Sequence, residues 1–196
     1  MTATASHLDI FPTRLWSFDL PELAPRQAAW TQAVQALRAQ SPEPAGRSNR
    51  QGWNSEATLF SRPEFAPLHQ ACAAAFRDVF KAMQADAKFK RFRLEAWANV
   101  HDQGGYNTVH VHPGAQLSGS FYLTLPEGSG AIVFRDPRPG AAMSVIRGAV
   151  PNSTSDVKIM PKAGTLLVFP SWLEHGVEAH AGEAPRISIA INAVAG

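Results

Sequence analysis

The sequence contains little cysteine, no long apolar run and no excess of one charge. Cys72 is the single cysteine among 196 residues, so an intrachain disulfide is excluded and a reducing compartment is expected. No apolar stretch is long enough to cross a bilayer. The segment 1–11 lacks a charged start followed by a long apolar run, so it does not read as a signal peptide. We therefore expect a cytoplasmic protein with no membrane contact.

The charge pattern gives no sign of a nucleic-acid partner. Charged residues make up 17% of the chain and the formal net charge is only +2. The one basic run, KFKRFR at 88–93, alternates with aromatic residues, and a basic surface strand explains it well. The chain also lacks internal repeats, coiled-coil heptads and a glycine-rich loop that would hold a phosphate. We expect no nucleic acid as a partner.

The length fits a single domain, 1–196, with a substantial core. Its first part, 1–88, is predicted to supply an edge strand at 9–21 and helices at 24–40 and 64–86. An apolar stripe runs along the second helix from Leu68 to Met83 and includes Cys72, which is therefore predicted to be a buried structural thiol.

From residue 89 onward the apolar pattern changes to a period of two, which is typical of strands. Turn signals such as DQGG (102–105), HPGA (112–115) and PKAG (161–164) separate the expected strands. This part, 89–196, is predicted to be the core of a mainly β protein, a sandwich or barrel with the two helices packed on one side. Strands are expected at 89–99, 108–112, 117–125, 131–134, 157–160, 165–169, 176–179 and 186–193.

Two long stretches read as loops. The segment 41–60 is rich in Pro, Gly, Ser and Asn yet contains Trp53, so it is either a linker or a lid over a site. The segment 136–156 reads as an insertion between strands. Gly46–Ser55 and Arg138–Ser155 are therefore the candidates for substrate-facing loops.

Three histidines suggest a metal site. His110 and His112 lie at i and i+2 in an expected strand, so their imidazoles point to the same face. Two ligands bind an ion weakly, and the best third candidate is His175, which follows a buried strand and a bend at Pro170. An exposed strand pair is the alternative for the first two. The remaining histidines, at 7, 69, 101 and 180, lack such a context and suit surface or capping roles.

A second pair suggests an anion site. Arg186 and Ser188 share one face of the strand RISIAIN. An arginine buried on a strand needs a partner, and its guanidinium matches a carboxylate bidentately. Ser188 could donate a further hydrogen bond to the same carboxylate.

In these features the chain resembles the double-stranded β-helix (jelly-roll) Fe(II)/2-oxoglutarate-dependent oxygenases. It is most similar to a bacterial family with a His-x-His…His…Arg-x-Ser pattern. The matching pieces occur in the family's order and cover most of the chain. They are SNRQGWNS (48–55), WANV (97–100), HVHPGAQLSGSFYL (110–123), FRDPR (134–138), PKAGTLLVFPSWLEHGV (161–177) and RISIAIN (186–192).

The resemblance implies roles for individual residues. His110 and His175 would bind Fe(II), and Arg186 with Ser188 would bind the far carboxylate of 2-oxoglutarate. Tyr122 would add a phenol to that carboxylate, or is a core aromatic residue instead. His112 stands where most of these enzymes have Asp or Glu, so it either ligates the metal as a third imidazole or orients the substrate.

Other polar residues are weaker candidates. Asn99 is assigned to the cosubstrate site, and Asn107 to the substrate side of the mouth. Trp53 and Asn54 could form a lid over substrate, although burial explains the tryptophan equally well. Arg138 could contact substrate or simply pair with Asp136 at a turn.

The implied reaction converts 2-oxoglutarate and O2 to succinate and CO2 and oxidises, usually hydroxylates, an unactivated C–H bond of a small-molecule or peptide substrate. Two other functions remain open from the sequence. One is a three-histidine metal cupin that works without a 2-oxo acid, as a dioxygenase or an isomerase. The other is a non-catalytic β-fold binding module. A homodimer is also left open, since dimers are common for such folds.

Overall fold

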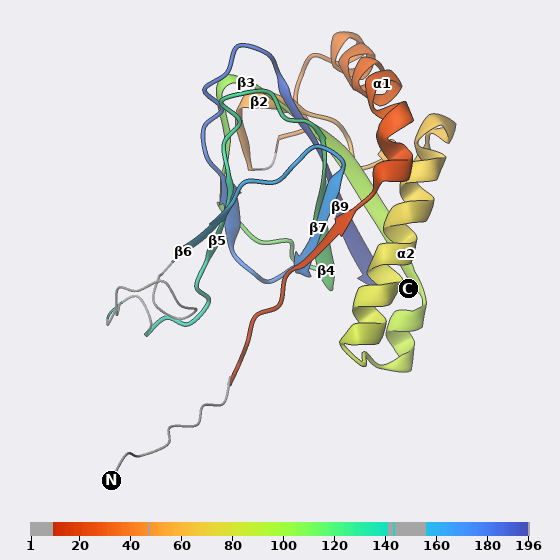
Figure 1. Cartoon of the computed structure of the whole chain (residues 1–196), viewed down its shortest axis with the longest axis vertical. Helices are drawn as coiled ribbons and strands as arrows, with labels where there is room; N and C mark the ends of the chain where they lie inside the picture. The colour runs from red at the N-terminus through yellow and green to blue at the C-terminus, as the bar shows by residue number, and fades with distance from the viewer. Residues whose placement is uncertain (1–9, 47, 141–142, 144–155, 196) are drawn as a thin grey trace.

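The computed structural model describes residues 10–46, 48–140, 143 and 156–195. They form one curled antiparallel sheet with two helices against its outer face (Figure 1). The strands follow the order β1-β7-β4-β9-β3-β8-β5-β6, and β2 pairs with β3 beside this path. The fold class is thus mainly β with two N-terminal helices, as the sequence predicts.

The helices are α1 (Gln27–Gln40) and α2 (Ala66–Ala82), with short 3-10 helices η1 (Pro21–Arg26), η2 (Leu59–Ser61), η3 (Pro63–Phe65) and η4 (Ala87–Lys90). The strands are β1 (Trp16–Asp19), β2 (Asn49–Asn54), β3 (Phe92–His110), β4 (Leu117–Thr124), β5 (Ile132–Arg135), β6 (Asp156–Ile159), β7 (Thr165–Pro170), β8 (His175–Val177) and β9 (Arg186–Ala195). No helix within these described ranges is long and apolar enough to cross a membrane.

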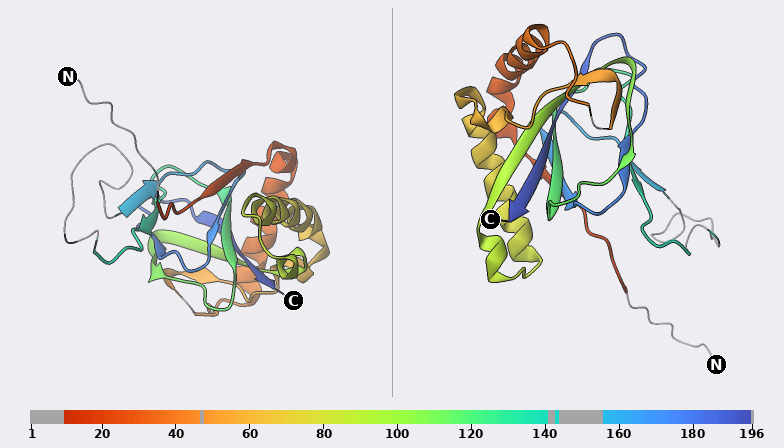
Figure 2. Two further views of the ribbon diagram at one scale, coloured as in Figure 1. Left: turned by 90° about the horizontal axis from the view of Figure 1, so that it is seen from below. Right: turned by 180° about the vertical axis from the view of Figure 1, so that it is seen from behind.

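The main core lies between the helices and one half of the sheet. Helix α1 contacts β4, and α2 contacts β7. Both helices lie on the same side of these strands in Figures 1 and 2. The buried stripe of α2 consists of Leu68, Cys72, Ala75, Phe76, Val79 and Phe80. Burial is as predicted for Cys72 and raises the pKa of its thiol. Met83, predicted to continue the stripe, is instead the exposed C-cap of the helix.

Strand β3 crosses the whole molecule, which corrects the prediction of two strands separated by a turn. The DQGG stretch was predicted to be a turn between two strands, but β3 continues through it. Gly104, with φ +84°, produces an irregularity rather than a reversal of the chain. The first half of β3 pairs with β9, and its second half pairs with β8.

The segment 41–60, predicted to be a loop, contains the strand β2, so this prediction was wrong for that part. Strand β2 pairs with β3, but the register shifts between Arg50 and Gly52, and Gln51 has a φ of +50°. This bulge removes the alternation by which a strand is recognised. Gly52 is required by close approach, because a Cβ there would lie 2.6 Å from the backbone oxygen of Val100.

The inner face of the curled sheet carries a different set of residues from the outer face. Ile187, Ile189 and Ile191 of β9 pack in the helical core, so Arg186, Ser188 and Ala190 point inward. A smaller apolar cluster fills part of the interior and comprises Tyr122, Ile132, Phe134, Leu167, Phe169 and Leu173. The polar residues predicted to form a site therefore project into the curl.

Candidate metal centre

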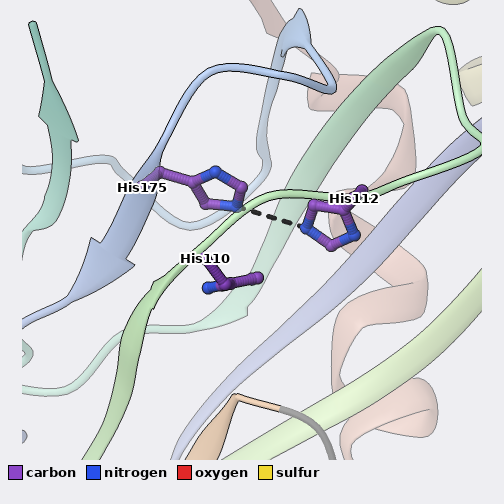
Figure 3. A group of neighbouring side chains, drawn as sticks. All are labelled: His110, His112 and His175. Atoms are coloured by element: carbon purple, nitrogen blue, oxygen red, sulfur yellow. Dashed lines mark hydrogen bonds between the residues drawn. The ribbon is translucent and has the colours of Figure 1, made fainter. Parts of the chain in front are cut away.

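The end of β3, the residues just after it and the start of β8 bring the predicted histidines together. His110 is the last residue of β3 and the Cα partner of His175, the first residue of β8. His112 follows two residues later, and its N–H donates to the carbonyl of Ser171 at 3.0 Å. The three side chains converge in Figure 3, and each offers one nitrogen such that all three lie within 4.8 Å of one another. Residues separated by 65 positions in sequence thus form one cluster.

Backbone carbonyls select the nitrogen that each of two rings presents. His110 Nδ1 lies 2.7 Å from the carbonyl oxygen of Thr108, and His175 Nδ1 lies 2.8 Å from that of Leu173. Each Nδ1–H therefore donates to the backbone, and each Nε2 keeps its lone pair. His112 Nε2 is 3.3 Å from His175 Nε2, the contact dashed in Figure 3. Two nitrogens bound to one ion at about 2.1 Å would be separated by about 3 Å, so this spacing suits a shared ion.

Burial keeps two of the three rings, those of His110 and His175, neutral. The pKa of His175 is lowered to about 4, first by burial and then by the nearby His110. Burial also lowers the pKa of His110, against the opposing effect of its bond to the Thr108 carbonyl. Near pH 7 both rings are unprotonated, which is the form that binds a metal ion.

Two polar residues support His110 from the side. Ser48 Oγ lies 3.2 Å from His110 Nε2 and accepts a hydrogen bond from Asn107 Nδ2 at 2.9 Å. Asn107 thus lies beside the histidine cluster. Its predicted role, on the substrate side of the mouth, stays a prediction. Ser48 was not singled out from the sequence. Its only signal is that it opens the SNRQGWNS stretch, which β2 carries against β3.

Arg186 forms a second centre on the inner face of β9. It is 1% exposed, and none of the ion pairs in the described part of the chain includes it. Its Nη1 is hydrogen-bonded to Ser188 Oγ at 3.3 Å and lies 3.4 Å from His101 Nδ1. Within the described part of the chain, its Nε and Nη2 have no hydrogen-bond partner. These two nitrogens form one edge of the guanidinium, the edge that binds a carboxylate through two parallel hydrogen bonds.

Tyr122 contributes a third unpartnered group. Its ring lies under the guanidinium of Arg186, with the Cζ atom 5.6 Å from the ring centroid. Its hydroxyl is buried and has no hydrogen-bond partner among the residues that the structure describes. Burial raises the pKa of the phenol to about 12, against the opposing influence of Arg186. The hydroxyl is therefore protonated and able to donate.

The structure gives Ser188 one contact that was not predicted. Its Oγ accepts from Nη1 of the guanidinium, which leaves the hydroxyl proton for the predicted bond to a carboxylate. Ser188 therefore fixes the arginine on the side away from the free edge. Its role toward a carboxylate remains a prediction.

The placement of His101 on the surface or in a cap was wrong. Its side chain is fully buried, on the same face of β3 as Asn99, and it pairs across the sheet with Arg186. The prediction rested on the lack of a ligand-like context around His101, and its pairing with Arg186 across the sheet is not recorded in any local pattern.

Two of the three asparagine candidates, Asn54 and Asn99, lie in one row across the sheet. The Cα partners run from Asn54 in β2 to Asn99 in β3, then to Ser188 in β9 and Tyr122 in β4. Directly opposed residues of antiparallel strands share a face, so all four point into the curl. Asn54 is 1% exposed and neither polar atom of its carboxamide has a hydrogen-bond partner.

Trp53 and Arg138 have other local partners. Trp53 packs in the core between sheet and helices, and its indole N–H donates to the Ser41 carbonyl at 2.7 Å, so packing explains this residue. Arg138 Nη2 contacts Asp136 Oδ2 at 2.6 Å at the turn after β5. Most of the predicted substrate-facing loop 138–155 lies outside the described residues.

These contacts fit a divalent ion and a carboxylate. A cluster of three imidazoles is a suitable set of ligands for a transition metal. An inner-face guanidinium with a free edge, beside an unpartnered phenol, is suited to an anion. The ion and the anion would both lie within the curl of the sheet.

Comparison with known families gives one match. The model of the family described as "Putative 2OG-Fe(II) oxygenase" matches residues 95–192, half of the chain. The match begins in β3 and ends in β9, so it contains the three histidines, Tyr122 and Arg186. No curated protein has a significantly similar sequence.

Solved structures share the fold at low sequence identity. A prolyl-4-hydroxylase from Pseudomonas putida is 13% identical with a TM-score of 0.69, and the alignment covers 94% of both chains. HygX from Streptomyces hygroscopicus, solved with nickel and 2-oxoglutarate bound, is 14% identical with a TM-score of 0.64, over 93% of this chain and 83% of HygX. The 2-oxoglutarate-dependent epimerase SnoN of nogalamycin biosynthesis is 14% identical with a TM-score of 0.65, over 93% and 78%.

Proposed function

Because the chain belongs to the 2OG-Fe(II) oxygenase family, we propose that it oxidises an unactivated C–H bond, in the first instance by hydroxylation. As a member of this family it is a non-haem iron oxygenase that uses Fe(II) and 2-oxoglutarate. This separates it from a three-histidine cupin that needs no 2-oxo acid, and from a non-catalytic module.

His110, His112 and His175 are proposed to hold the iron. The support is the convergence of their ring nitrogens within 4.8 Å and the Nδ1–carbonyl bonds, which leave Nε2 of His110 and His175 as the nitrogens with a lone pair. Three neutral imidazoles leave a ferrous ion with its full +2 charge. Bound 2-oxoglutarate, with charge −2, would then make the cluster neutral, whereas a carboxylate ligand would make it negative. His112 accordingly takes the place of a carboxylate ligand.

Arg186 is the single observation that carries the cosubstrate part of the proposal. An unpaired guanidinium in a protein interior is costly, and this one keeps Nε and Nη2 free on one edge. We assign that edge, with the phenol of Tyr122, to the distal carboxylate of 2-oxoglutarate. Ser188 holds the opposite nitrogen of the guanidinium. Asn99, which pairs with Ser188 across the sheet, is proposed to line the same part of the site.

The residues around the site orient the reactants and exclude water. Iron with 2-oxoglutarate supplies the oxidising chemistry when bound, with succinate and CO2 as co-products. The protonated Tyr122 donates a hydrogen bond, and Arg186 fixes the distal carboxylate in direction and depth. Phe134 and Phe169 pack against the ring of His175, so apolar contacts shield one side of the metal position from solvent.

A small molecule or a peptide is the proposed substrate class. The solved relatives named above include a prolyl hydroxylase and an enzyme that was also solved with the antibiotic hygromycin B bound. Asn107 and Ser48 beside His110 offer a polar contact at the metal position. Asn54, with an unpartnered carboxamide, is proposed as a further polar contact for substrate, and Arg138 as a more distant one.

Spectroscopy of the anaerobic complex tests the proposal. Addition of Fe(II) and 2-oxoglutarate should produce a weak visible charge-transfer band in the wild-type protein. Arg186→Ala should abolish the band at cosubstrate concentrations that saturate the wild type. Arg93→Ala, which removes an exposed arginine paired with Glu95, should leave it unchanged and serves as the matched control.

A second experiment tests the metal ligands and the outcome of the reaction. Fe(II) binding should be lost in the His110→Ala/His112→Ala double variant, and unchanged binding would contradict the assigned site. Succinate production screened against metabolites and peptides identifies a substrate. A product mass increased by one oxygen supports hydroxylation, whereas a product of unchanged mass would identify an epimerisation in its place.

A further inference from the structure

His101 is a buried histidine that the proposed reaction does not use. Its Nδ1 atom lies 3.4 Å from Nη1 of Arg186, and its Cα is the cross-strand partner of the Arg186 Cα. We propose that His101 is a positioning residue that holds the Arg186 guanidinium so that its free edge faces the cosubstrate carboxylate. This inference rests on the proposed role of Arg186.

The hydrogen bonds of Arg186 are distributed unevenly over its three nitrogens. Nη1 is close to two acceptors, Ser188 Oγ and His101 Nδ1, while Nε and Nη2 have none. Because a guanidinium is planar and rigid, two acceptors on one terminal nitrogen fix the plane of the whole group. One acceptor would leave the group free to rotate about that contact. His101 thus supplies the second contact that the orientation requires.

The imidazole can accept this hydrogen bond because it is unprotonated. The pKa of His101 is lowered to about 3, by burial first, then by the charge of Arg186 and by His180. The side chains of Asn107 and Asp102 act in the opposite direction. A neutral ring with its proton on Nε2 leaves the lone pair of Nδ1 for Arg186.

Packing keeps the ring of His101 in place. Gly52 is its Cα partner in β2, and a Cβ added to Gly52 would lie 3.0 Å from His101 Cδ2. Gly105 approaches the same residue from the other side, where an added Cβ would lie 3.0 Å from His101 Cβ. Two glycines therefore make room for the imidazole between β2 and the irregular part of β3.

Paired binding measurements test the positioning role. His101→Leu removes the acceptor, whereas His101→Asn places an amide oxygen near the position of Nδ1. Binding of 2-oxoglutarate to the Fe(II)-loaded protein is measured without oxygen, by calorimetry and by the charge-transfer band. Pyruvate is measured in parallel, because it has the 2-oxo acid group but no distal carboxylate. His180→Gln is the control, since both ring nitrogens of His180 lie within hydrogen-bond distance of backbone carbonyls, those of Gly128 and Ala184, and no hydrogen bond among the described residues joins His180 to Arg186.

The expected result is selective. His101→Leu should weaken 2-oxoglutarate binding about tenfold, the effect of one hydrogen bond to a charged group, and should leave pyruvate binding unchanged. His101→Asn should restore most of the affinity, and His180→Gln should match the wild type in both. In turnover, His101→Leu should raise the KM for 2-oxoglutarate more than it lowers kcat.

Three results would overturn the inference. They are wild-type affinity for 2-oxoglutarate in His101→Leu, an equal loss of affinity for both 2-oxo acids, and an equal loss in the Leu and Asn variants. Failure of the wild-type protein to bind 2-oxoglutarate would instead refute the proposed function itself. The two failures are therefore distinguishable in one set of titrations.

Discussion

Replacement of Arg186 by methionine should stabilise the metal-free fold while it removes cosubstrate binding. The guanidinium is buried, has no carboxylate partner among the described residues and leaves Nε and Nη2 unbonded. Burial lowers its pKa, the direction expected when the charged form is disfavoured. The methionine side chain is unbranched and flexible and carries no charge into the same space.

The size of the effect follows from two opposing contributions. An ion in a protein interior costs several kcal/mol even after the surroundings relax. The contacts of Nη1 with Ser188 and His101, at 3.3 and 3.4 Å, return about 1 kcal/mol each. The net gain in the free energy of unfolding for Arg186→Met should be about 2 kcal/mol. For a domain of this size it corresponds to a rise in Tm of about 4–8 °C.

Urea unfolding in the presence of a metal chelator measures this gain directly. Arg186→Lys is the matched variant, because it keeps a buried charge but loses the planar edge; it should bind 2-oxoglutarate poorly without any gain in stability. For wild-type protein loaded with Fe(II), 2-oxoglutarate at 100 times its Kd should raise the free energy of unfolding by about 2.7 kcal/mol. A loss of 2 kcal/mol or more in the metal-free Arg186→Met variant would refute the reasoning, because the guanidinium would then be part of the structural network.

Three further substitutions test other features of the site. Tyr122→Phe removes a buried hydroxyl with no hydrogen-bond partner, so chemical unfolding of the metal-free protein should show unchanged or slightly raised stability, while calorimetry should show about tenfold weaker 2-oxoglutarate binding. The pKa of His101 is about 3 in the folded protein against about 6.5 in the unfolded chain. Its contribution to the free energy of unfolding is therefore complete above pH 6.5 and is lost as the pH falls, by about 3 kcal/mol at pH 4. His101→Asn should flatten this part of the stability profile measured by urea unfolding. Gly52→Ala places a Cβ 2.6 Å from both Asn49 Oδ1 and the Val100 carbonyl oxygen, so it should lower the free energy of unfolding by more than 1 kcal/mol, and a neutral effect would show that β2 can move away.

The division into helices and strands could be predicted from the sequence because it depends on local periodicity. The stripe of α2 and the alternation in the first half of β3 and in β9 identify the helical face and the inner face of the sheet. Strand β2 could not be recognised, because the bulge at Gln51 breaks its alternation. Pairing with β3, which no local pattern records, is what makes it a strand.

The histidine cluster was accessible for a similar reason. His110 and His112 share a face by spacing alone, and a bend after Pro170 indicates His175. The residue that contacts Arg186 could not be predicted from the sequence. Which side chain meets Arg186 depends on the register of β3 against β9, where His101 is opposite, and register is set by tertiary pairing rather than by composition.

Because β3 is one unbroken strand, it carries both halves of the site. His101 lies opposite Arg186 in its β9-paired half, and His110 lies opposite His175 in its β8-paired half. The backbone between His101 and His110 therefore sets the distance between Arg186, which is proposed to bind the carboxylate, and the proposed metal position. An insertion or deletion of one residue between them would shift one pairing relative to the other, unless the irregular part of this segment absorbed it. The chain length of the 2-oxo acid that can reach both ends would then be set by the number of residues in this segment.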